Sequence, residues 1–147
     1  MRRLLAAAAA VSLLGAGPAL AAKPVPKHAP CKAPAGAFVV KPGTPLTQTP
    51  TTPIGALGGF EEPVGDFYVD LGGRPNSSTS TLEFELSWTN PLSDYDLVVN
   101  GVNELGTDNP EVISVKGNHC RRVSVAIDLF TGVPVDELTL VAKATPR

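Results

Sequence analysis

Strict alternation of polar and apolar residues is the feature that most constrains how this chain can fold. Residues 81–88 alternate without a fault and place Leu82, Phe84, Leu86 and Trp88 on one face of an extended strand. Residues 122–129 repeat the pattern, with valine, isoleucine and leucine on the apolar face. Shorter or weaker strands are predicted at 37–40, 66–71, 95–99, 111–115 and 137–142. No helical period follows, so we expect an all-β protein.

Turn-forming residues separate the predicted strands. The chain holds 14 Gly and 15 Pro, and turn signals fall between the alternating segments, at 72–76, 100–101, 108–110, 116–118 and 131–132. Short strands at near-regular spacing are typical of an antiparallel β-sandwich or barrel. A length of 147 residues allows one such domain and argues against two.

The first 21 residues have the layout of a secretory signal peptide. Arg2 and Arg3 give a positive start, residues 4–14 are almost all apolar, and Ala19 and Ala21 suit a cleavage site. As a helix the apolar run would extend only about 16 Å, against about 30 Å for a bilayer core. We therefore expect a secreted protein, extracellular or in the cell envelope, with no membrane span after signal cleavage.

The mature chain is predicted to have two parts. Residues 22–63 are rich in Pro and Thr, which favours an extended arm in place of a helix. Residues 64–147 carry the alternating pattern and form the predicted sandwich domain. Two of the 12 Lys and Arg residues lie in the signal, so ten remain against 14 Asp and Glu. Such an acidic balance gives no basic excess for a phosphate backbone, and no nucleic-acid partner is expected.

The chain contains two cysteines, Cys31 and Cys120. In an oxidising compartment, an even count predicts an intramolecular disulfide between them. A catalytic thiol and a zinc site are the alternatives. Zinc needs four ligands, and this chain offers two Cys and two His, with His28 in the proline-rich arm. The disulfide is therefore the favoured interpretation.

One segment resembles a known family. Trp88 followed by Asp94-Tyr-Asp96-Leu97 is similar to the strand-loop-strand of bacterial pre-peptidase C-terminal (PPC) domains, and Pro110-Glu111 is similar to the start of their next strand. The resemblance extends over residues 65–144. It implies a jelly-roll-like β-sandwich that serves secreted peptidases as a non-catalytic module, associated with substrate adhesion, secretion or later removal.

The chain departs from that family in two ways. No peptidase domain precedes the module, which leaves its role open. The family's Gly-x-Tyr pattern appears here as residues 117–120, which end in Cys120. This second departure fits a disulfide in place of an aromatic packing contact.

Asp94, Asp96 and Glu111 are the candidate metal ligands. Calcium binds six to eight oxygens, and carboxylates near a loop rich in Asn supply several of them. The alternative is structural: Asp94 starts a turn and Asp96 caps loop N–H groups. Some PPC domains bind calcium through acidic residues that lead into the module. Glu61, Glu62 and Asp66 have roughly that place here.

Catalytic motifs are sparse, and the sequence predicts no enzyme and no cofactor other than the calcium alternative. Glu83 and Glu85 lie about 7 Å apart on one strand face, which favours a solvated face over a glycosidase pair. His28 lies in the arm and His119 in a turn, where we expect both to be exposed. Aromatic candidates for a sugar platform are weak: Phe60, Tyr68 and Tyr95.

The predicted function is that of a secreted, non-catalytic binding module. Its expected partner is an extracellular polymer or a component of the cell envelope. One alternative is a structural or adhesive envelope protein that uses the arm as a spacer. Another is a small secreted hydrolase with an unrecognised site.

Overall fold

The computed structural model describes residues 23–51, 61–103, 108–132 and 136–147. The predicted signal peptide and Phe60 lie outside the described residues. The described part of the chain contains no helix, and so none that could cross a membrane.

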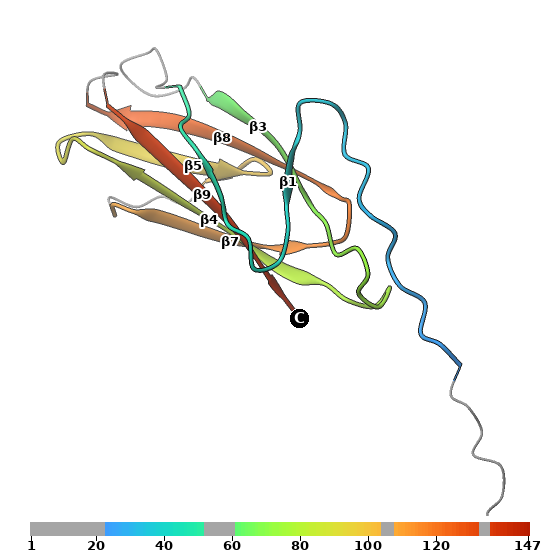
Figure 1. The fold of residues 1–147 in the computed structure, drawn as a ribbon. Helices are drawn as coiled ribbons and strands as arrows, with labels where there is room; N and C mark the ends of the chain where they lie inside the picture. The colour runs from blue at the N-terminus through green and yellow to red at the C-terminus, as the bar shows by residue number, and fades with distance from the viewer. Residues whose placement is uncertain (1–22, 52–60, 104–107, 133–135) are drawn as a thin grey trace, which may run out of the picture.

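Within the described residues, nine strands form two sheets that pack face to face (Figure 1). The strands are β1 (Phe38–Val40), β2 (Leu46–Gln48), β3 (Glu62–Val69), β4 (Ser80–Trp88), β5 (Asp94–Val99), β6 (Val102–Asn103), β7 (Glu111–Gly117), β8 (Arg122–Thr131) and β9 (Leu138–Pro146). One sheet has the order β1-β3-β8-β5-β6 and the other β2-β9-β4-β7. All strand pairs are antiparallel except β1 with β3. The prediction of an all-β sandwich is confirmed.

The core lies between the sheets and is made by the predicted alternating faces. Leu82, Phe84 and Leu86 of β4 are fully buried, and Trp88 is 7% exposed. The apolar face of β8 is buried in the same way. Burial of these side chains removes apolar surface from water, which supplies the main favourable free energy of folding.

The proline-rich arm is part of the body. β1 extends the first sheet beside β3, and β2 extends the second beside β9. Before them, the carbonyl groups of Pro26 and His28 accept backbone hydrogen bonds from the turn that follows β3: Asn76 N–H donates to Pro26 O, and Gly73 N–H donates to His28 O. The described residues of this segment contact both sheets. The predicted boundary at residue 63 falls inside β3.

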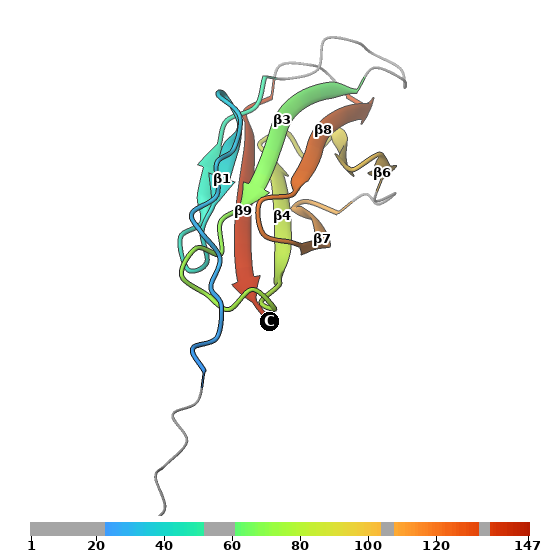
Figure 2. The same cartoon turned by 90° about the vertical axis from the view of Figure 1, so that its right-hand side faces the viewer.

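The strand register defines two ends of the sandwich. At one end, β3, β7 and β9 finish and β4 and β8 begin; Ser80 pairs there with both Gly117 and Pro146. At the other end, β4 and β8 finish and β5, β7 and β9 begin; Trp88 pairs there with Leu138. Figure 2 shows the C-terminus, at the finish of β9, and the described start of the arm at the lower end, with the start of β3 and the finish of β8 above.

Candidate functional site

Asp94 and Asp96 lie on the outer face of β5, because the intervening Tyr95 and the following Leu97 point into the core. Antiparallel pairing places Asp128 of β8 directly opposite Asp96. Asp96 is only 4% exposed, whereas its two acidic neighbours are half-buried. Three carboxyl groups therefore gather on one sheet face.

The surroundings of Asp96 disfavour its charged form. Burial raises the pKa of its carboxyl, and the nearby charges of Asp94 and Asp128 raise it further. Like charges directly opposite each other across a ladder destabilise a sheet. In addition, Asp94 Oδ1 is buried without a hydrogen-bond partner. This group of carboxyls thus carries an electrostatic cost.

Glu111 has a different role from those aspartates. It begins β7, is 3% exposed, and accepts a hydrogen bond from the backbone N–H of Leu97 in β5. The two strands belong to different sheets, so this carboxylate links the sandwich across its open side. That role is structural: the carboxylate satisfies a backbone donor that would otherwise be buried without a partner.

The contacts do not assemble the predicted calcium ligands. Within the described residues, no group of three His, Cys, Asp or Glu side chains is placed to hold a metal ion. Nor does any described N–H group donate to Asp96, so the capping alternative is not seen either. The orphan oxygen of Asp94 favours a cation, while the engaged carboxylate of Glu111 does not. Calcium binding stays a prediction.

The predicted disulfide between Cys31 and Cys120 is present. It joins the arm to the turn between β7 and β8. The two cysteines are 89 positions apart in the sequence. The described residues contain no free cysteine, so neither sulfur is available there as a thiol nucleophile.

Beside the disulfide, His28 and His119 stack on each other. Their ring centroids are 4.2 Å apart, and both residues are half-buried, so the expectation that both are exposed was wrong. His119 Nδ1 accepts a hydrogen bond of 3.0 Å from Leu71 N–H. Sequence reasoning missed this pair because the residues are far apart in the chain. The adjacency of His119 to Cys120 was the available signal.

Asp70 completes this region. Its Oδ1 accepts hydrogen bonds from the N–H groups of Cys31, at 3.0 Å, and Gly72, at 2.9 Å. Burial acts to raise the pKa of this carboxyl, but the two hydrogen bonds, with Lys41 and His119 nearby, outweigh it and lower the pKa. Asp70 therefore stays ionised and holds the arm against the turn after β3.

The remaining sequence candidates have structural partners. Lys143 Nζ lies 3.6 Å from Glu83 and 2.8 Å from Glu85, which fits a solvated, ion-paired face. Tyr95 is fully buried and its hydroxyl donates to Asp136 at 2.9 Å, so it is not part of an exposed sugar platform. Tyr68 is half-buried.

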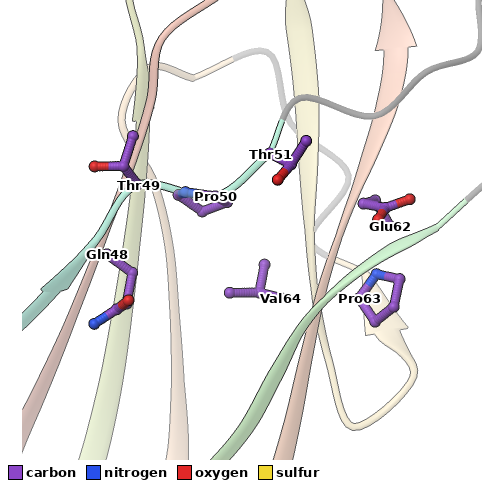
Figure 3. A pocket seen from close by; sticks show the side chains of 7 residues that line it. All are labelled: Gln48, Thr49, Pro50, Thr51, Glu62, Pro63 and Val64. Carbon is purple, nitrogen blue, oxygen red and sulfur yellow. The ribbon is translucent and has the colours of Figure 1, made fainter. Parts of the chain in front are cut away.

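A small pocket of about 180 Å³ lies between the end of β2 and the start of β3 (Figure 3). Its lining is Gln48, Thr49, Pro50, Thr51, Glu62, Pro63 and Val64. Glu62 is the one titratable group in this lining, and nucleophilic catalysis needs a nucleophile beside a base. The pocket thus lacks a catalytic pair among its lining residues.

Charge is segregated between the two ends of the sandwich. Exposed cations gather where β3 and β9 finish, a surface that we call the basic end: Lys27, Lys32, Lys41, Arg74, Lys116, Arg121 and Arg147. None of them forms an ion pair with a residue that the structure describes. Acidic residues gather at the opposite, acidic end: Glu62, Asp94, Asp96, Asp108, Glu111, Asp128, Asp136 and Glu137. The net charge of the whole chain does not show this separation of positive and negative side chains.

No family model, curated protein or solved structure matches the chain. The resemblance to PPC domains accordingly stays a prediction drawn from the segment around Trp88. The sandwich, the disulfide and the distribution of charge are the observations on which a function can be argued.

Proposed function

We propose that the chain is a secreted, non-catalytic β-sandwich module that binds a macromolecule or a cell-envelope surface. The observation that carries the proposal is the basic end, a group of exposed cations without ion-pair partners among the described residues. A folded domain that keeps such a group together creates a local field suited to an anionic partner. The signal-like first 21 residues and the resemblance to PPC domains support secretion and adhesion.

The geometry of the candidate catalytic residues favours binding over hydrolysis. The glutamates of β4 contact Lys143, and His119 accepts a backbone hydrogen bond. The arm alternative is less favoured, because backbone pairing holds several described segments between Pro26 and Gln48 against the body.

A co-sedimentation experiment tests this function. The purified protein is mixed with insoluble collagen, chitin or isolated cell walls, and the pellet is compared with that of an unrelated acidic protein of similar size. We expect retention on at least one polymer and no release of soluble fragments from it. A protein that stays in the supernatant with every polymer, or that solubilises one of them, would contradict the proposal.

A further inference from the structure

We propose that the basic end binds an acidic polysaccharide, through the carboxylates of a linear chain of sugar acids. This inference rests on the proposed surface-binding function and names the partner class. Three features of the basic end support it: the positions of the cations, the contacts that hold them in place, and the polar groups between them.

The cations of the basic end come from segments that the fold brings together. Lys41 and Arg74 line the same open hollow, of about 370 Å³, between the end of β1 and the turn after β3. Lys27 pairs with Pro75 in that turn through a backbone bridge. The hollow also contains Asp70, whose carboxylate is engaged by two backbone N–H groups. Positive side chains therefore border a depression that is accessible from solvent.

The disulfide keeps further cations in place. It fixes the Cα atoms of Cys31 and Cys120 at 5.2 Å, and each cysteine is followed by a cation, Lys32 and Arg121 respectively. The stacked histidines and the hydrogen bonds between arm and turn hold the same surface. A preorganised set of cations loses less conformational entropy on binding than a flexible tail would.

The acidic balance of the whole chain does not oppose binding at this end. The two ends are separated by the length of β9, nine residues, which is about 30 Å at the usual rise of a strand. The Debye length is about 8 Å at physiological ionic strength. A polyanion at the basic end is thus screened from the acidic end. The acidic end in turn faces away from an anionic surface, so the module would bind in one orientation.

The groups between the cations favour a sugar over a lipid or a nucleic acid. Asn76 and Ser77 are exposed in the turn after β3, and Arg147 N–H donates to Thr79 O beside them, so amide and hydroxyl groups lie near cations. Of the exposed large apolar residues in the described chain, Val25 lies in the arm beside this end and Val102 in the β5–β6 hairpin, near the start of β8. The other three lie toward the acidic end, so the basic end has few apolar side chains to insert into a membrane. The two histidine rings are half-buried and stack on each other, which leaves less aromatic surface than the open platforms on which bases stack.

The test measures affinity for polygalacturonate by isothermal titration calorimetry at 20 and 200 mM NaCl. We expect binding that weakens with salt. The variant Arg74→Gln with Arg121→Gln should bind about 30-fold more weakly. Each cation near an anionic surface contributes about 1 kcal/mol to binding, and each 1.4 kcal/mol corresponds to about a tenfold change in affinity. Both side chains are exposed, so melting temperature should stay unchanged.

The matched control changes the net charge by the same amount at the acidic end. Leu92→Glu with Phe130→Glu introduces two carboxylates at exposed positions, and its affinity should stay within about twofold of wild type because the change lies beyond the screening length. Equal loss in both double variants would overturn the location. Tighter binding of polyphosphate, duplex DNA or anionic lipid vesicles at equal salt would overturn the choice of partner.

The outcomes also separate this inference from the proposed function. If chitin or collagen retained the protein equally at both salt concentrations, and retained the Arg74/Arg121 variant as well as wild type, surface binding would stand. The basic end would then be refuted as its site. A protein that binds neither these polymers, nor cell walls, nor polygalacturonate would refute both proposals.

Discussion

Replacement of Trp88 tests the packing of the sandwich most directly. Its ring lies at the acidic end of the core, 7% exposed, and stacks edge to face on Tyr95 with ring centroids 5.5 Å apart. Its Nε1–H donates a hydrogen bond of 2.8 Å to Ser93 O. The side chain therefore combines three favourable interactions, which two substitutions can separate.

The magnitudes follow from those interactions. Removal of a buried Trp side chain costs about 3–5 kcal/mol, so Trp88→Ala should lower the free energy of unfolding by that amount. Trp88→Phe keeps most of the apolar contact but leaves the Ser93 carbonyl without its donor, and should cost about 1–3 kcal/mol. Glu83→Ala is the control on the opposite face. Its carboxylate forms a surface pair with Lys143, so the change should cost under about 0.5 kcal/mol.

Urea unfolding followed by far-ultraviolet circular dichroism measures all of these changes. Circular dichroism is needed because Trp88 is the only tryptophan, and both variants lose the fluorophore. Equal destabilisation by Trp88→Ala and Glu83→Ala would refute the assignment of the two strand faces. A Trp88→Phe variant as stable as wild type would refute the contribution of the indole hydrogen bond.

Three further predictions concern the disulfide and Asp96. Replacing Cys31 and Cys120 with Ser should lower the free energy of unfolding by about 4–5 kcal/mol, because the bond closes a loop of 89 positions; an unchanged urea midpoint would contradict this. Asp96→Asn should stabilise the protein at pH 7. Folding raises the pKa of Asp96, so its contribution to the free energy of unfolding is greatest below the unfolded pKa near 3.8 and is lost as pH rises through the native pKa. If urea titrations gave the variant the same dependence of stability on pH as wild type, this prediction would be contradicted. Finally, melting temperature should be the same in calcium and in chelator, and a shift of several degrees that Asp96→Asn abolishes would establish the calcium site.

Alternation made most of the sandwich predictable. β4 and β8 each have one buried and one solvated face, so their period-two pattern was visible in the sequence. β2 and β6 were missed because two or three residues carry no period. β5 was found as a strand, but the burial of Tyr95 was not predicted. Its residues are buried on both faces, so alternation does not show which side chains point inward.

The candidate sites were less predictable because they depend on register. Asp128 joins Asp96 only through the antiparallel pairing of β5 with β8. His28 meets His119 only because the arm runs back along the turn after β3. The basic end arises in the same way, from segments scattered between Lys27 and Arg147. Net charge sums over these positions and does not reveal where the fold places them.

The way the chain alternates between its two sheets governs when it can fold. From β3 to β9, the strands fall in the first and second sheets in turn, apart from the short β6, which pairs with β5. The longer strands therefore pair with partners distant in sequence, a topology of high contact order that folds slowly. β9, the last strand of the chain, lies between β2 and β4 in the middle of its sheet. The second sheet can thus be completed only after residues 138–146 have been synthesised, because β9 is the strand that joins β2 to the β4–β7 pair.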